Sequence, residues 1–223
     1  MSSYPLDTEG VWRQVLSPSI LSQPVPSRRS GRVPALFLDR DGVVVEEVGY
    51  LQRTGDVTLI AEAAAAIVAA NWRGVPVVLV TNQAGIGRGY YGWAEFMAVQ
   101  EKILSELAAA GASVDAVYAC PHHPAGIGSF AHADHPARKP NPGMLLRAEE
   151  DLALDLRRSW LIGDKAADIE AAKRAGLAGA MHVMTGHGEA ERAAAAALAT
   201  PGFEVRPARS IANAVELPLF APD

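Results

Sequence analysis

The sequence predicts an α/β protein built on a doubly wound parallel sheet, because short apolar runs alternate along the chain with segments of helical periodicity. The runs are apolar on both faces, as in strands that helices cover from two sides. The expected strands are 33–38, 75–80, 116–119, 160–162 and 179–184. The expected helices are 61–72, 93–110, one that begins near residue 141, 166–175 and 189–198.

Most of these helices have a local reason to begin or end where they do. Asn141 is expected to cap its helix, with Pro142 in the first turn. A short last helix is expected over 209–217, and a weak helical turn over 11–16. Three helices end just before a glycine, which commonly follows a helix: 61–72 (Gly74), 93–110 (Gly111) and 166–175 (Gly176).

The composition indicates one globular domain with a small-molecule partner. The chain has 223 residues, of which 49% are hydrophobic, and a formal net charge of −5. We expect one domain over 33–223 and, because 1–32 is proline-rich, an extended N-terminal extension outside the core. Nothing is basic enough to favour nucleic acid, and no apolar run approaches the ~20 residues that span a membrane. The single cysteine fits a reducing compartment, so we expect a cytoplasmic location. Nothing in the sequence demands an oligomer, so we expect a monomer.

Polar side chains follow four of the predicted strands, at the point where each strand ends. Asp39 and Asp41 follow the first strand, and alternation in an extended chain points them the same way, with Arg40 pointing opposite. The carboxyl ends of parallel strands meet at one edge of a sheet, so these residues are expected to share a crevice. The later strands supply Thr81, Asn82, Gln83 and Arg88, then Arg138 and Lys139, then Asp164, Lys165 and Asp168.

Acids, an ammonium group and a hydroxyl–amide pair at one edge suit phosphoryl transfer. A carboxylate that attacks a phosphate meets a repulsion of roughly 4 kcal/mol per charge pair at 4 Å and an effective dielectric of 20. Lys139 and a Mg²⁺ ion held by acidic oxygens would offset it. Taken singly, Asp164 could instead cap a helix, and Thr81 could belong to an ordinary turn.

In order, these motifs resemble those of the haloacid dehalogenase-like phosphohydrolases, whose fold is Rossmann-like. The resemblance covers about 33–186 and rests on Asp39-Arg40-Asp41-Gly42, Val80-Thr81-Asn82, Lys139 and Gly163-Asp164 with Asp168. It is closer to the subgroup that contains phosphatases of D-glycero-D-manno-heptose 1,7-bisphosphate and of histidinol phosphate. The segments that carry this closer match are 37–42, 49–50, 81–89, 120–124 and 138–144.

The resemblance implies a Mg²⁺-dependent phosphomonoesterase acting on a sugar bisphosphate, such as the heptose compound. Asp39 would be the nucleophile that becomes phosphorylated, and Asp41 would protonate the leaving alkoxide and then activate water. The transferring phosphoryl group would be bound by Thr81, Asn82 and Lys139. Magnesium would be held by Asp39, the main-chain carbonyl of Asp41 and Asp164, with Asp168 behind them. Substrate contacts would come from Gln83, Arg88, Lys165 and, for a second phosphate, Arg138.

The sequence departs from the subgroup in the loop that would carry a structural zinc ion. Cys120 and His122 stand at two ligand positions and His135 at a third, but Ala137 occupies the fourth. Tetrahedral structural zinc takes four ligands, and these three together with His132 or Asp134 could still bind a metal. A loop held by hydrogen bonds, without a stable zinc ion, is favoured. His182 and His187 are expected to be surface or core residues.

Three alternatives remain open at this point. The substrate could be histidinol phosphate or another small phosphomonoester. The chain could also be a phosphoacceptor domain, or a phosphosugar-binding protein without activity. No insertion is large enough for a cap domain, so 46–59 and 121–138 are expected to shape the pocket entrance.

Overall fold

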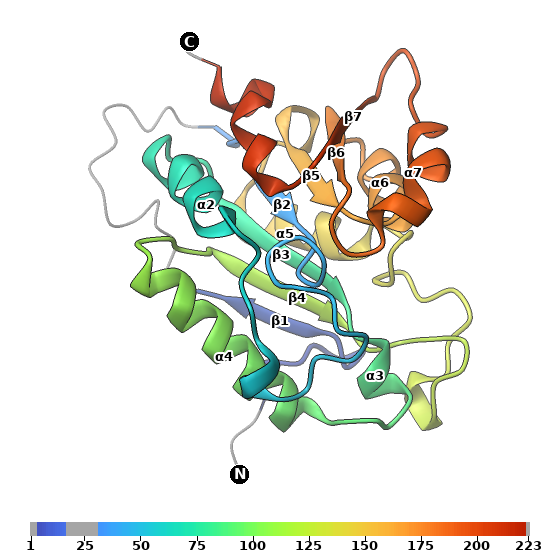
Figure 1. Cartoon of the computed structure of the whole chain (residues 1–223). Coiled ribbons are helices and arrows are strands. Elements are labelled where there is room, and N and C mark those ends of the chain that lie inside the picture. The colour runs from blue at the N-terminus through green and yellow to red at the C-terminus, as the bar shows by residue number, and fades with distance from the viewer. Residues whose placement is uncertain (1–3, 17–30, 222–223) are drawn as a thin grey trace.

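A single sheet forms the centre of the molecule (Figure 1). The computed structural model describes residues 4–16 and 31–221, and in these ranges seven strands run in the order β1-β4-β3-β2-β5-β6-β7. The pair β1–β4 is antiparallel, and every other neighbouring pair is parallel. The strands are β1 (Trp12–Val15), β2 (Leu36–Leu38), β3 (Val77–Asn82), β4 (Ala116–Cys120), β5 (Trp160–Gly163), β6 (Gly179–Val183) and β7 (Glu204–Ala208).

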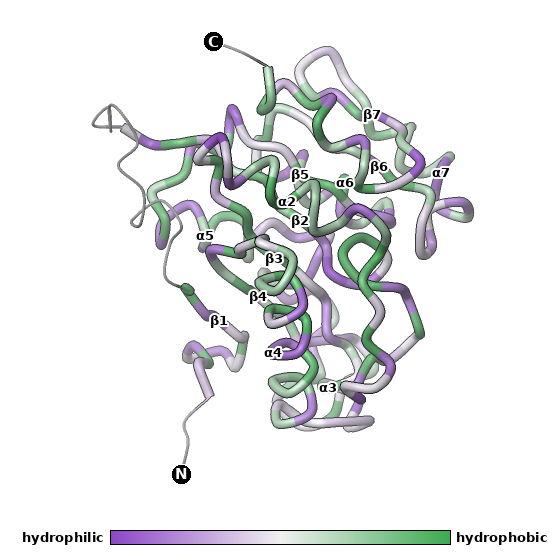
Figure 2. Tube along the Cα trace, turned by 60° about the vertical axis from the view of Figure 1, so that its left-hand side comes forward, coloured by the Kyte–Doolittle hydropathy of each residue, from purple (hydrophilic) through white to green (hydrophobic). Residues whose placement is uncertain are grey.

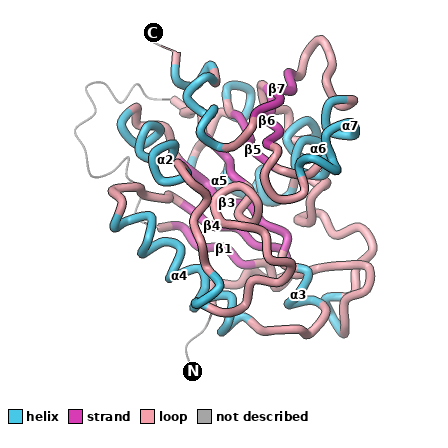
Figure 3. Tube along the Cα trace, in the orientation of Figure 1, coloured by secondary structure: helices cyan, strands magenta, loops and turns pink. Residues whose placement is uncertain are grey.

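Helices cover both faces of this sheet, which confirms the doubly wound architecture (Figures 1 and 3). Within β2, Leu36 and Leu38 join one apolar cluster while Phe37 joins the other, as the alternation of a strand requires. In Figure 2, α4 alternates between hydrophobic and hydrophilic colours, as expected of a helix with one buried side. The first cluster includes α2 (Ala63–Trp72) and α4 (Trp93–Ala109), and the second includes α5 (Gly143–Leu152), α6 (Ala166–Arg174) and α7 (Gly188–Ala196).

The prediction for the N-terminal segment is wrong where the structure describes it. Trp12–Val15 forms an edge strand instead of a helical turn, and Trp12 is 1% exposed in the core. Its indole stacks on Trp93, with 5.5 Å between ring centroids, and meets Phe96 edge-on at 5.2 Å. These partners lie far along the chain on α4, so no local pattern encodes the strand. Residues 17–30 of the expected extension lie outside the described residues.

Three further differences from the prediction concern β2, β7 and the last helix. The first predicted strand is shortened to β2, and Val33 makes only an isolated bridge to Leu154. The edge strand β7 was not predicted, because its residues are exposed or half-buried and include Pro207. The expected last helix is a 3₁₀ helix, Ile211–Glu216.

In the described ranges, no helix is both long enough and apolar enough to cross a membrane.

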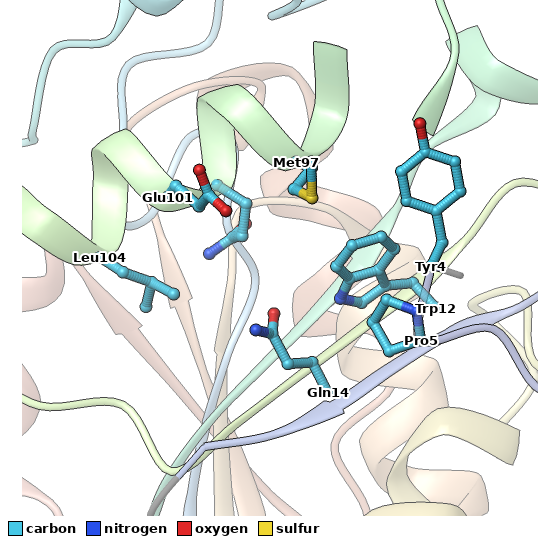
Figure 4. A pocket seen from close by; sticks show the side chains of 8 residues that line it. Tyr4, Pro5, Trp12, Gln14, Met97, Glu101 and Leu104 are labelled. Carbon is cyan, nitrogen blue, oxygen red and sulfur yellow. The ribbon is translucent and has the colours of Figure 1, made fainter. Parts of the chain in front are cut away.

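The N-terminal segment and α4 enclose a small cavity of about 130 Å³ (Figure 4). Figure 4 shows Trp12 and Tyr4 on one side of this cavity and Met97, Glu101 and Leu104 of α4 on the other. Gln100 also lines it. The amide oxygen and nitrogen of Gln100 are both buried and have no hydrogen-bond partner among the described residues.

A buried amide without partners costs folding free energy, which leads to a testable expectation. Gln100→Leu should raise the free energy of unfolding by about 1–3 kcal/mol, measured by urea denaturation. The half-buried Gln14 faces the same cavity, and Gln14→Leu should change stability by no more than about 0.5 kcal/mol. A destabilised Gln100→Leu protein would contradict the expectation.

Candidate active site

The site lies where the order of strands reverses. From β2 at the centre, the chain adds β3 and β4 on one side and β5, β6 and β7 on the other. Ligands of doubly wound sheets bind beyond the carboxyl ends of the strands at such a point. Asp39 extends the pairing there, since its N–H donates to the Ile162 carbonyl at 3.0 Å. A cavity of about 390 Å³ opens at this edge.

Three carboxylates and one ammonium group come together at this edge of the sheet, and Asp39, Asp168 and Lys139 of this group line the cavity. Oxygens of Asp39, Asp164 and Asp168 lie within 4.8 Å of one another, the one such group of potential metal ligands among the described residues. The ammonium nitrogen of Lys139 lies 2.8 Å from Asp39 and 2.5 Å from Asp168, and it donates to the Val80 carbonyl at 2.8 Å. The structure therefore brings together acids from two strand ends with the predicted lysine.

The cluster has more negative than positive charge, and the pKa values respond accordingly. Burial, then the charges of Asp39 and Asp168, raise the pKa of Asp164 to about 7. Burial alone would lower the pKa of Lys139, but attraction to Asp168 and Asp39 outweighs it and raises that pKa, so Lys139 stays charged. Burial also raises the pKa of Asp168, and Lys139 opposes the change. A bound cation would relieve this excess of negative charge.

The donor set also fits a hard divalent cation. Asp164 Oδ1 is buried and has no hydrogen-bond partner among the described residues, whereas Oδ2 accepts from the His187 N–H at 2.8 Å. Carboxylate oxygens are the ligands that Mg²⁺ prefers. The Asp41 carboxylate is not part of this group, so the predicted ligand role of Asp41 rests on its main-chain carbonyl alone.

Two glycines make room for the Asp164 carboxylate. Gly42 and Gly186 have φ values of +86° and +58° and come together around it. A Cβ on Gly186 would lie 2.3 Å from Asp164 Oδ2 and 2.7 Å from the Gly42 Cα. The Thr185 hydroxyl, which donates to the Gly42 carbonyl at 2.5 Å, ties the two segments together.

Gly186→Ala is therefore expected to displace Asp164. We expect a weaker Mg²⁺ affinity and at least a tenfold lower kcat, measured by calorimetric titration and phosphate release, a loss of about 1.4 kcal/mol. Gly111→Ala is the matched control, because Gly111 has φ +80° and open space around its Cα. Both variants should share a backbone cost of about 1 kcal/mol in stability, but only Gly186→Ala should lose activity. Equal activities would contradict the expectation.

The polar residues that follow β3 lie in the cavity wall, but their side chains mainly bond to protein groups. The Asn82 amide donates to the Lys139 carbonyl at 2.9 Å and accepts from the Lys139 N–H at 3.1 Å, so it fixes the lysine's backbone. Gln83 Nε2 donates to the Thr81 hydroxyl at 2.9 Å and to Asp41 at 3.0 Å. The Tyr91 hydroxyl donates to Gln83 Oε1 at 2.6 Å, and burial raises the Tyr91 pKa to about 12, which keeps this donor protonated.

The predicted direction of Arg40 is wrong. Its side chain does not point away from the acids but forms a two-point ion pair with Asp41, with a closest N–O distance of 2.8 Å. The strand β2 ends at Leu38, so strict alternation does not extend to these residues. The Asp41 carboxylate still lines the cavity together with Asp39.

Most of the predicted substrate contacts also lie at the cavity. Arg138 and Lys165 line it, whereas Arg88 is not among the lining residues and instead bonds to the Tyr50 hydroxyl and the His123 ring. Burial alone would lower the Lys165 pKa, but nearby acids, Asp39 first, raise it overall. Arg138 and Lys165 therefore offer positive charge to an anionic ligand in the cavity.

Sequence reasoning missed several residues of the cavity rim. Glu47 lies 3.4 Å from Lys165 and 3.3 Å from the His187 ring, and all three line the cavity. As expected, His187 is an exposed residue and His182 a buried one, but His187 also lines the cavity. Tyr50 and Tyr91 are further lining residues. Glu47 and Tyr50 lie in 46–59, the segment expected at the entrance, which was the one available signal.

The cysteine–histidine loop is tied together by hydrogen bonds. The rings of His122 and His135 stack with centroids 3.6 Å apart, and Cys120 Sγ lies 4.0 Å from His135 Nδ1. Glu9 of the N-terminal segment closes the group, because its carbonyl lies 2.8 Å from His122 Nε2 and its carboxylate 3.5 Å from His135 Nε2. The Ala137 N–H donates to His135 Nδ1 at 3.1 Å, and burial raises the Cys120 pKa to about 12.

Known proteins resemble this chain in sequence and in structure. A family model for HAD-like hydrolases matches residues 136–214. A protein of Mesorhizobium japonicum named D-glycero-beta-D-manno-heptose-1,7-bisphosphate 7-phosphatase is 45% identical over 206 residues, which cover 92% of this chain and 87% of the relative. The crystal structure of a HAD-like phosphatase from Mesorhizobium loti is 41% identical in sequence and superposes with a TM-score of 0.81. The superposition covers 98% of this chain and 95% of the Mesorhizobium loti chain.

One further crystal structure contains ligands. It is D,D-heptose 1,7-bisphosphate phosphatase of B. bronchiseptica complexed with magnesium and phosphate. It is 30% identical to this chain, covers 82% of it and 97% of its own length, and has a TM-score of 0.72.

Proposed function

The chain belongs to the haloacid dehalogenase-like hydrolases, and from that membership we propose that it removes one phosphate from a sugar bisphosphate, D-glycero-D-manno-heptose 1,7-bisphosphate. It is a phosphatase, a hydrolase of phosphomonoester bonds. The observation that carries the proposal is the Asp39 carboxylate, which shares Lys139 with Asp168 at the floor of a cavity of about 390 Å³. The similarity to the named heptose bisphosphate phosphatases supports the choice of substrate.

In the proposed reaction, Asp39 attacks the phosphorus atom and the ester bond to the sugar oxygen breaks. Asp41 gives a proton to that oxygen and later takes one from the water that hydrolyses the aspartyl phosphate. Thr81, Asn82 and Lys139, which line the cavity, would bind the transferring group, with Lys139 supplying a buried positive charge. Asp39, Asp164 and the Asp41 carbonyl would hold Mg²⁺, which when bound would offset the repulsion between carboxylate and phosphate.

The proposed substrate also suits the cationic groups farther out. Arg138 and Lys165 line the cavity without being part of the carboxylate cluster. An arginine fork matches phosphate oxygens, so we propose that Arg138 binds the phosphate that is not removed. Gln83, in contrast, is proposed to act through Asp41 and Thr81, to which its amide already donates.

The test is phosphate release with Mg²⁺ from heptose 1,7-bisphosphate, histidinol phosphate and simple sugar monophosphates. We expect the highest kcat/KM for the heptose bisphosphate and loss of turnover in EDTA. Preference for histidinol phosphate would move the chain to the other branch of the subgroup. A phosphoaspartate that persists for minutes without phosphate release would instead identify a phosphoacceptor domain.

We propose further that the loop around Cys120 keeps its shape without zinc, through the contacts of His122, His135 and Glu9. Metal analysis of protein purified without chelator should then find well below one zinc per chain. The proposal would be overturned by a protein that contains one zinc per chain and in which Glu9→Gln lowers both the zinc content and the folding stability. The expectations of a monomer and of a cytoplasmic location stay predictions. Because β1 belongs to the sheet, we propose that the domain includes this strand and does not begin at residue 33.

A further inference from the structure

The Asp41 carboxylate is held on both oxygens by donors of the protein. Arg40 Nε and Nη2 donate to Oδ1 at 3.0 and 2.9 Å, and Nη2 also donates to Oδ2 at 2.8 Å. Gln83 Nε2 donates to Oδ2 at 3.0 Å. These four donor contacts, from two side chains, fix the position of the Asp41 side chain.

The Arg40 side chain is buried between Asp41 and Phe96, and Arg40 also lines the cavity. Its side chain is 1% exposed, and its guanidinium carbon lies 5.4 Å from the centre of the Phe96 ring on α4. Among the described residues, Asp41 is its one acidic partner, and its Nη1 has no hydrogen-bond partner. Burial of a guanidinium group costs folding free energy, so stability alone does not explain this ion pair.

The second donor, Gln83, is oriented by a third residue. An amide can rotate to present either oxygen or nitrogen, but the Tyr91 hydroxyl donates to Gln83 Oε1 at 2.6 Å. Nε2 therefore faces Asp41. The place of Tyr91 depends on Gly85, because a Cβ there would lie 2.2 Å from Tyr91 Cε1.

We propose that Arg40 is a positioning residue that fixes the Asp41 side chain for the transfer of its proton to the departing sugar oxygen. In that step the Asp39–phosphorus bond forms, the phosphorus–oxygen ester bond breaks, and the Asp41 proton moves to the departing oxygen. The same carboxylate then takes a proton from water in the second step. Gln83, oriented by Tyr91, is the second donor. The inference rests on the proposed function, since it presupposes that Asp41 transfers protons.

The leaving group provides the test. A sugar alkoxide needs a proton as it departs, whereas p-nitrophenolate is stable without one, so the loss of a positioned Asp41 should affect the two unequally. With enzyme in excess over substrate, Arg40→Met should slow heptose monophosphate formation from the bisphosphate by about 10–100-fold. Release of p-nitrophenol from p-nitrophenyl phosphate should slow by less than about threefold. Arg40→Lys, with one donor centre in place of a fork, should restore part of the sugar phosphate rate.

Arg13→Met is the matched control. Arg13 also makes a two-point ion pair with an aspartate, Asp151, but neither residue lines the cavity. Its loss should change neither rate. If the Arg40→Met protein does not fold, Tyr91→Phe is measured in its place. Without the Tyr91 hydroxyl, the Gln83 amide can rotate away from Asp41. That variant should slow the sugar phosphate step by about 3–10-fold with the same selectivity.

Equal slowing of both substrates, or no slowing of the sugar phosphate step, would overturn the inference. Either result is separate from failure of the proposed function, which is decided by Asp39→Asn. If Asp39→Asn is inactive and Arg40→Met slows both substrates equally, only the role of Arg40 is lost.

Discussion

Asp39→Asn is expected to lower phosphatase activity by at least about 10³-fold, a loss of about 4 kcal/mol in transition-state stabilisation, while the protein stays folded. An amide is a far weaker nucleophile than a carboxylate. The fold should survive because Asp39 Oδ1, which accepts from Lys139 and from the Arg40 N–H, is matched by the amide oxygen. Steady-state phosphate release and thermal unfolding measure the two effects.

Asp56→Asn is the control for Asp39→Asn. Asp56 is an exposed aspartate in a short 3₁₀ helix, outside the cavity lining. Its replacement should leave activity and unfolding temperature unchanged. Asp39→Asn protein with the activity of the parent would exclude Asp39 as the nucleophile.

Lys139→Met should have the largest combined effect on activity and stability. The lysine is buried between Asp39 and Asp168, and its removal leaves three carboxylates within 4.8 Å of one another without their ammonium partner. Loss of one partner from a buried ion pair costs about 3–5 kcal/mol. We expect that loss in the free energy of unfolding in EDTA, a smaller one with saturating Mg²⁺, and activity close to background.

The surface pair of Lys102 and Glu106 on α4 provides the comparison for Lys139→Met. This pair is separated by 3.0 Å, with the two side chains 46% and 31% exposed. Lys102→Met should cost no more than about 0.5 kcal/mol and leave activity unchanged. A Lys139→Met protein that is as stable and as active as Lys102→Met would contradict the account of the cluster.

The residues at the floor of the site could be predicted because the topology itself brings them together. Asp39 and Asp164 follow β2 and β5, and Thr81 lies at the end of β3, so the strand pattern was enough to place them at one edge. The orientation of Arg40 could not be predicted, because β2 ends before it and the chain turns toward Gly42. Tyr91 contributes through a hydrogen bond to Gln83 that no motif spacing reveals.

The edges of the sheet show a second limit. The strand β1 depends on Trp12 packing against Trp93 and Phe96, a contact between distant segments without a local periodicity. The strand β7 is exposed or half-buried, so its hydrophobic pattern is weak. Glu9 lies in the same N-terminal segment and contacts His122 and His135. These contacts depend on the position of β1, so they could not be predicted either.

A single-turnover experiment tests the role of Asp39 most directly. Enzyme in excess is mixed with Mg²⁺ and a substrate labelled in the phosphate to be removed, quenched in acid within one turnover, and mapped by peptide mass spectrometry. A transient phosphoryl group on the peptide that contains Asp39, appearing before free phosphate and decaying as phosphate is released, is the predicted result. Phosphate release with no phosphorylated peptide at any time, or with the phosphoryl group on another residue, would contradict the account.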